Sequence, residues 1–273
     1  MFLHNIITKP LLAVAALSLL TLASCDELDQ DERLEYVKPA QVSRAVLIED
    51  FTGQKCVNCP LATDEIHALQ EQYGDSVVIA VGIHSGPLGF KGNKRSVGLA
   101  TTLGDTYYNY WGPDHQPIGL VNRVGGLNDY PAWAALVRQA LTETAPLDIH
   151  LSTDYTADSR QLNVTAAAYG TNGTTTGKLQ VWLVEDSITA MQMIPDGSTD
   201  VEYVHNHVLR ATMNGDWGED ITVNEGSTTD KTYTLALDEK WIPAHVSVIA
   251  FVYNDGGVQQ VVKKPIINNQ PTQ

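Results

Sequence analysis

Hydrophobic and polar positions follow two different patterns, one on each side of residue 146. Between residues 41 and 145, short apolar runs alternate with segments whose apolar positions recur every three or four residues. This alternation predicts strands followed by helices, and hence an α/β domain. From Pro146 onward, apolar positions mostly recur at every second residue, and turn-forming clusters separate the runs. That period predicts an all-β domain over residues 146–273, built as an Ig-like antiparallel sandwich.

The α/β part is expected to begin with a strand at 45–51 and a helix at 57–73 that ends at Gly74. A near-continuous apolar run at 76–83 predicts a strand covered on both faces. Three further elements follow in the pattern: a helix within 94–111, a strand at 117–122 and a helix at 132–143.

The N-terminal apolar run predicts export. It spans Leu11 to Ala23, thirteen residues, which is the length of a signal-peptide core and too short to cross a bilayer. The run ends in Leu22-Ala23-Ser24-Cys25, which resembles a bacterial lipobox. We therefore expect residues 1–24 to be removed and Cys25 to be lipidated, with ordinary secretion and cleavage near Cys25 as the alternative.

The distribution of charge adds two expectations, one about the residues that follow Cys25 and one about the partners of the protein. Five of the seven residues at 26–32 are acidic, so 25–40 is predicted to be a lipidated, solvated tether. The stretch also resembles the acidic export signal of surface-exposed lipoproteins. The whole chain has a formal net charge of −15 at pH 7, which argues against nucleic acid and anionic membrane surfaces as partners. The membrane is expected to be reached through the lipid.

The chain has three cysteines, and lipidation of Cys25 leaves only Cys56 and Cys59. Within one chain these two can pair only with each other, as a Cys56–Cys59 disulfide. Their C-x-x-C spacing lies between a predicted strand and a predicted helix, the local context of a redox site. A four-residue ring gains little chain entropy from a disulfide, so stability alone is a poor reason for the pair.

The stretch from Val46 to Tyr73 resembles thioredoxin, with Asp50 six residues before Cys56. Pro117, before an apolar strand, is similar to the family's cis-proline. The resemblance implies that Cys56 attacks, Cys59 resolves, Asp50 accepts a proton and Pro117 positions the substrate. The chain departs from the family at Lys55, where an aromatic residue is usual, and in the Val-Asn pair between the cysteines.

Over nearly the whole mature chain, the sequence also resembles the Omp28-related outer-membrane lipoproteins of the Bacteroidota. The resemblance rests on the lipobox, the stretch from Leu47 to Pro60, the stretch from Tyr203 to Arg210, and Trp217-Gly218. It implies a protein that is lipid-anchored in the outer membrane and faces the periplasm or the cell surface.

Two functions follow as hypotheses. The first is a thiol–disulfide oxidoreductase whose partners are envelope proteins with thiols or disulfides, with no cofactor. The second is a non-catalytic binding or adhesion lipoprotein that uses the thioredoxin fold as a scaffold. No metal is expected, because a zinc site would need two of His67, His84 and His115 to join the two cysteines.

Two further clusters have open interpretations. His205 and His207 are either a metal pair or part of a polar cluster with Arg210 and Trp217 that supports a turn. The aromatic side chains of Tyr107, Tyr108, Tyr110 and Trp111 either pack in the core or line a groove beside the cysteines.

Overall fold

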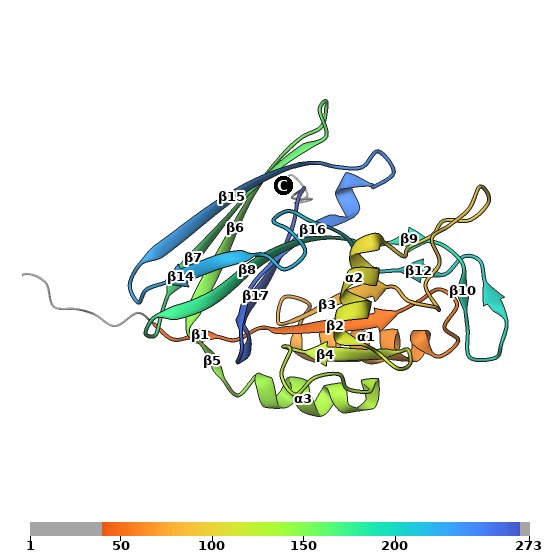
Figure 1. Ribbon diagram of the computed structural model, residues 1–273, viewed down its shortest axis with the longest axis horizontal. Coiled ribbons are helices and arrows are strands. Elements are labelled where there is room, and N and C mark those ends of the chain that lie inside the picture. The colour runs from red at the N-terminus through yellow and green to blue at the C-terminus, as the bar shows by residue number, and fades with distance from the viewer. Residues whose placement is uncertain (1–39, 268–273) are drawn as a thin grey trace, which may run out of the picture. The chain divides into compact units, whose positions relative to one another are not determined.

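A computed structural model describes residues 40–267, which belong to one compact unit. Two sheets dominate this unit (Figure 1). The larger has eight strands in the order β17-β16-β8-β13-β3-β2-β4, with β14 also paired to β8, and the smaller has the order β15-β7-β6. The described part of the chain is therefore mostly β-sheet with few helices.

The elements up to residue 145 are β1 (Val42–Ser43), β2 (Val46–Thr52), α1 (Cys59–Tyr73), β3 (Val78–His84), α2 (Thr102–Trp111), β4 (Ile118–Val121), α3 (Trp133–Ala140) and β5 (Thr144–Ala145). The long strands that follow are β6 (Leu147–Thr156), β7 (Gln161–Gly170), β8 (Thr175–Glu185), β13 (Val208–Thr212), β14 (Glu219–Val223), β15 (Thr228–Ala236), β16 (Val246–Asn254) and β17 (Gly257–Pro265). Four two-residue strands lie between β8 and β13, namely β9 (Ile188–Thr189), β10 (Gln192–Met193), β11 (Thr199–Asp200) and β12 (Val204–His205).

The predicted elements before residue 146 are all present, with shifted ends. The helix expected from residue 57 begins at Cys59, with Pro60 in its first turn, where a missing N–H costs nothing. The helix expected within 94–111 begins at Thr102, because the Thr101 hydroxyl accepts the Gly104 N–H at 2.9 Å and caps it. The preceding loop folds back on itself so closely that a Cβ on Gly98 would overlap the backbone of Gly92.

Three hydrophobic cores fill the unit. Helices α1 and α3 pack on one face of β2, β3 and β4, around Ile66 and Trp133. On the opposite face, α2 packs with Tyr107 against Trp182 of β8 and Phe251 of β16 (Figure 1). The third core lies between the three-stranded sheet and the strands β8, β14, β16 and β17.

The larger sheet joins the two predicted domains. Strand β13 pairs parallel with β3 at Val208 and Gly82, and antiparallel with β8. Strands from both sides of residue 146 therefore hydrogen-bond within one sheet, and the second core takes residues from both. The domain boundary between residues 145 and 146, with a separately folding domain on each side, stays a prediction.

Within residues 40–267 no helix is both long and apolar enough to cross a membrane. The predicted signal peptide, Cys25 and nearly all of the tether lie outside the described residues.

Candidate functional site

Cys56 and Cys59 form a disulfide, with their Cα atoms 5.4 Å apart. Cys59 is the first residue of α1, and Cys56 lies in the turn before it, where its N–H donates to Gly53 O at 3.0 Å. Cys59 thus lies at the start of the helix, whereas Cys56 lies about one turn before it. The cation of Lys55 lies over the ring of Phe90, at 5.5 Å from its centroid.

Both cysteines are buried, each with 2% of its surface exposed. Residues 188–205, which contain β9 to β12 and are called the covering segment below, lie against the loop that holds the cysteines. Gln192 in this segment donates from Nε2 to Cys56 O at 2.8 Å and to Gly53 O at 3.3 Å. The Met193 N–H donates to Gln54 O at 2.9 Å, and the Gln54 side chain donates to Met191 O at 3.0 Å. The loop around the disulfide and the covering segment are therefore held together by reciprocal hydrogen bonds.

Pro117 lies beside the disulfide, and the Gln116–Pro117 peptide bond is cis, as the thioredoxin resemblance implied. Gln116 O is 3.4 Å from Cys56 Sγ. A disulfide sulfur has no hydrogen to donate, so this contact becomes a hydrogen bond only when Cys56 is a thiol. The Gln116 side chain is fixed by donation from Nε2 to Thr52 O at 2.7 Å.

Asp50 lies on the α1 face of β2, with 3% of its surface exposed. Its Oδ1 is buried without a hydrogen-bond partner, and burial raises the pKa of the carboxyl to about 8. Asp50 and Cys59 line a common cavity of about 20 Å³, which has room for about one water molecule.

Three buried histidines line the same small cavity: His84 at the end of β3, His205 in β12, and His207. The rings of His84 and His205 are 5.2 Å apart. Burial lowers the pKa of His84, helped by the nearby His205 and Arg210, and burial lowers the pKa of His205 to about 4. Each of the three has one ring nitrogen that is buried without a partner. These imidazoles are therefore neutral at pH 7, beside the carboxyl and the disulfide.

The structure bears on both interpretations of His205 and His207. Among residues 40–267, no group of three or more His, Cys, Asp or Glu side chains is placed to hold a metal ion. The two histidines do belong to a polar cluster, but its other members differ from those expected. His207 packs against Asp186, whereas Arg210 pairs with Glu185 at 3.1 Å. Trp217 packs on Tyr107 instead.

The other candidate zinc ligands do not join the cysteines. His67 lies on α1 and faces His207, with ring centroids 6.1 Å apart. His115 is exposed between Asp114 and Asp129, with both ring nitrogens 2.7 Å from carboxylate oxygens. Hydrogen bonds that the His115 ring donates to the carboxylates of Asp129 and Asp114 raise the pKa of His115.

The opposite face of β2 has a second buried charged site, which the sequence did not reveal. Glu49, with 1% of its side chain exposed, accepts two hydrogen bonds from Arg123, at 2.6 and 2.9 Å. The Arg123 guanidinium lies within 6 Å of the ring centroids of Trp111, Trp182, Phe251 and Tyr253. A carboxylate within a buried apolar strand was the one signal that a cationic partner was needed.

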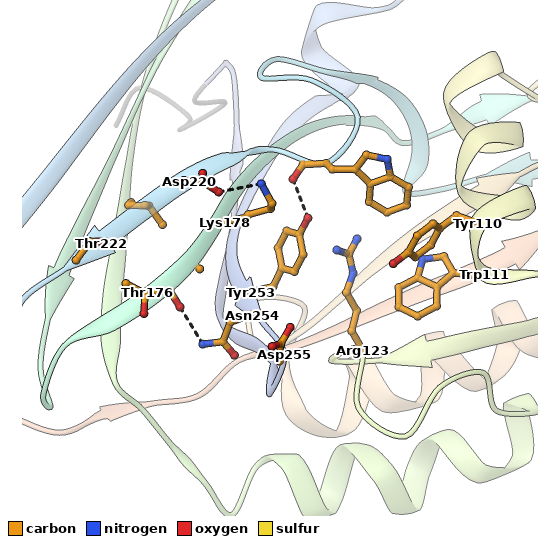
Figure 2. A pocket seen from close by; sticks show the side chains of 13 residues that line it. Tyr110, Trp111, Arg123, Thr176, Lys178, Asp220, Thr222, Tyr253, Asn254 and Asp255 are labelled. Carbon is orange, nitrogen blue, oxygen red and sulfur yellow. Dashed lines mark hydrogen bonds and ion pairs between the residues drawn. The ribbon is translucent and has the colours of Figure 1, made fainter.

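The aromatic cluster of α2 is divided between core and surface. Tyr107 is fully buried, and Tyr108 packs on Phe51 with ring centroids 6.4 Å apart. Tyr110 is 67% exposed and, with Trp111, lines a cavity of about 1070 Å³ (Figure 2). That cavity shares no lining residue with the small cavity at the disulfide, so the groove expected beside the cysteines lies elsewhere.

Comparisons with known proteins place the chain in a family. HBP35 of Porphyromonas gingivalis has a similar structure, with a TM-score of 0.65 at 15% identity, over 85% of this chain and 78% of that one. A crystallised domain of the outer membrane lipoprotein Omp28 from the same organism matches at 29% identity, with a TM-score of 0.34, over 45% of this chain and 88% of that one. A comparison with curated proteins found no match. The family described as outer membrane protein Omp28 matches residues 104–270, more than half of the sequence. The chain belongs to the Omp28 family of outer membrane proteins.

Proposed function

We propose that this protein is a thiol–disulfide oxidoreductase with Cys56 and Cys59 as its redox pair. The observation that carries the proposal is the convergence on one disulfide of a buried carboxyl, Asp50, and a cis-proline, Pro117. Asp50 precedes Cys56 by six residues and Pro117 lies about sixty residues further on, and a disulfide needed only for stability would require neither of the two.

The proposal includes a thioredoxin-like domain at 41–145 and an Ig-like sandwich at 146–273. The parallel pair β2 and β3 with α1 between them, followed by a cis-proline and the antiparallel strand β4, supports the first. The sandwich is supported by the core that lies between the three-stranded antiparallel sheet and the antiparallel strands β8, β14, β16 and β17 of the larger sheet.

The exchange begins when a substrate thiolate attacks Cys56 Sγ. A substrate–Cys56 disulfide forms, the Cys56–Cys59 bond breaks, and Cys59 leaves as a thiolate. A second substrate thiolate then attacks the substrate sulfur of the mixed disulfide and releases Cys56 as a thiolate. The substrate has lost two electrons and the Cys56–Cys59 pair has gained them. The sequence is reversible, and the reduction potentials of the two couples set its direction.

Asp50 is the proton carrier for Cys59. Burial raises the pKa of Asp50 to about 8, so at pH 7 the carboxyl holds a proton that it can donate to Cys59 as that sulfur leaves as a thiolate. One water in the cavity that both groups line provides the path. In the reverse direction, the Asp50 carboxylate takes the proton back from Cys59 as that sulfur attacks the mixed disulfide.

Burial of the disulfide favours the second function, a binding scaffold with an inert pair. With 2% of each cysteine exposed, no substrate sulfur can approach Cys56 while the covering segment is in place. The redox function therefore requires residues 188–205 to move, and its rate depends on how firmly Gln192 holds them.

The test is the exchange reaction itself. The full mature chain is mixed with a fluorogenic glutathione disulfide in a glutathione buffer, and turnover is compared with the Cys56→Ser and Cys59→Ser variants. We expect turnover only in the wild type, and a trapped glutathione–Cys56 disulfide only in Cys59→Ser, because that variant lacks the resolving thiol. Equal rates in the wild type and Cys56→Ser would refute the oxidoreductase function and leave the non-catalytic binding scaffold as the function.

Loosening the covering segment should speed the exchange. Gln192→Ala removes two hydrogen bonds to the loop around Cys56, each worth about 0.5–1.5 kcal/mol. We expect dithiothreitol to reduce the disulfide roughly tenfold faster in this variant, as measured by alkylation of the released thiols. Gln259→Ala is the matched control, since that side chain bonds only to nearby Asn254 and Gly257. An unchanged rate in Gln192→Ala would show that the segment does not limit access.

We also propose that the protein is held in the outer membrane by lipid on Cys25, after removal of residues 1–24. The lipobox supports this anchor, and residues 25–40 would separate the folded part from the bilayer. In Cys25→Ala we expect the protein to leave the membrane fraction and become extractable without detergent. Unchanged association with the membrane fraction would contradict the anchor.

A further inference from the structure

The cavity lined by Tyr110 and Trp111 has no part in the proposed exchange. It measures about 1070 Å³ and opens where α2, the Trp217 loop and the strands β8, β14 and β16 meet (Figure 2). Ligand pockets of about 300–1,000 Å³ bury most of the surface of a drug-sized molecule, so this cavity has room for a ligand of at least that size.

One wall consists of aromatic rings, of which Tyr110 is exposed and Trp111 and Trp217 are half-buried. The ring of Tyr110 lies 4.4 Å from Trp217 and 5.3 Å from Trp111, measured between centroids. Their positions are fixed from behind, because Tyr253 donates its hydroxyl to Trp217 O at 2.7 Å and Trp217 packs on the buried ring of Tyr107. Rings held rigidly in this way offer apolar faces to a ligand at little cost in conformational entropy.

Both cations that line the cavity already have a carboxylate partner. Arg123 donates two hydrogen bonds to Glu49. Lys178 lies 2.9 Å from the carboxylate of Asp220. Asp255 adds a further carboxylate to the lining. An anionic ligand would have to displace a carboxylate from its partner, so the lining disfavours an anionic ligand.

The floor opposite the aromatic wall is polar and already paired. Strand β8 forms the floor and is bonded to β14 on one side and to β16 on the other, so a peptide cannot add to it as a strand. The side chains of Thr176 and Thr222 present hydroxyl groups into the space, whereas the Asn254 amide at its border already bonds to Thr176 O (Figure 2). The hydroxyl groups both donate and accept hydrogen bonds, and a lipid chain would offer them no partner.

A ligand with apolar faces, many hydroxyl groups and no net charge meets all of these conditions. We infer that this cavity is a binding site for a neutral oligosaccharide, whose C–H faces stack on Tyr110 and Trp217 and whose hydroxyls bond to the polar floor.

The test uses cellohexaose and maltohexaose as probes, with binding to the full mature chain followed by calorimetry and tryptophan fluorescence. We expect at least one glucan to bind with a Kd of about 1 mM or tighter. Tyr110→Ala should weaken that binding about tenfold, whereas Tyr110→Phe should retain it, because the ring face and not the hydroxyl makes the contact. Tyr110 is mostly exposed, so its removal tests the site without disturbing the core. Trp217→Ala is the second variant.

Three outcomes would overturn the inference: no heat or fluorescence change with either glucan, affinity unchanged in both Tyr110→Ala and Trp217→Ala, or tighter binding of an anionic hexagalacturonate. Cys56→Ser should bind the glucans as the wild type does, so this site and the redox function succeed or fail separately.

Discussion

Replacing Arg123 with methionine is expected to lower the free energy of unfolding by about 3–5 kcal/mol. The substitution leaves Glu49 as an unpaired carboxylate with 1% of its side chain exposed. It also removes the cation from between four aromatic rings, the closest being Tyr253 at 4.4 Å. Urea denaturation followed by tryptophan fluorescence measures the change.

Two further variants make this prediction specific to the ion pair. Arg138→Met changes an exposed arginine on α3 and should alter stability by less than about 0.5 kcal/mol. The double variant with Arg123→Met and Glu49→Met removes both charges and should recover most of the loss, since a buried pair is often replaceable by apolar side chains. A double variant no more stable than Arg123→Met alone would mean that packing, and not the unpaired charge, causes the loss.

Asp50 should make the protein less stable as the pH rises. The folded state keeps a proton on Asp50 up to a pKa of about 8, whereas the unfolded chain loses it near 3.8. Between these values the folded state binds more protons than the unfolded state, so this group's contribution to stability falls by roughly 1.4 kcal/mol per pH unit. Asp50→Asn stays neutral at every pH. The free energy of unfolding of the variant, relative to that of the wild type, should therefore rise by about 1.4 kcal/mol per pH unit between pH 5 and pH 7.

The difference between wild type and variant isolates this carboxyl from the buried histidines. Burial lowers the pKa of His84 and His205, so those groups make the protein more stable as the pH rises, in both proteins alike. Denaturation at pH 5, 6 and 7 provides the data. The exposed Asp75→Asn is the control and should show a constant difference from the wild type. A constant difference for Asp50→Asn as well would contradict a buried, protonated carboxyl.

The parts of the site that lie close together in sequence were predictable. The order of Asp50, Cys56 and Cys59 along one strand and the start of one helix depends on local pattern, and the cysteine pairing followed from having only two thiols. Pro117 needed only the recognition of an X-Pro step before an apolar strand.

The parts that depend on pairing between distant strands were not predictable. His84 meets His205 because β13 lies next to β3, more than a hundred residues away in sequence, and no local pattern encodes that register. Gln192 reaches the disulfide for the same reason. Arg123 has φ near 57° in a turn after β4, a place that carries no periodic signal.

The shared sheet did leave a trace in the sequence. Residues 181–184 read Val-Trp-Leu-Val, a continuous apolar run within a stretch interpreted as a one-sided strand of period two. All four are buried, because β8 is covered on both faces. A continuous apolar run of this kind indicates a strand that is covered on both faces. At residues 181–184 the run was a better guide to the structure than the alternation around it.

The alternation along β8 and β16 sends neighbouring side chains to different cores. Val181 and Leu183 pack in the core between the two sheets, whereas Trp182 and Val184 pack with α2 on the other side. A slip of one residue in the pairing of β8 with β16 would exchange the two sets, and Trp182 would enter a space shaped for a leucine or valine. Correct packing in each core therefore requires the same pairing of β8 with β16 that the other core requires. A shift in that pairing would disrupt both cores at once.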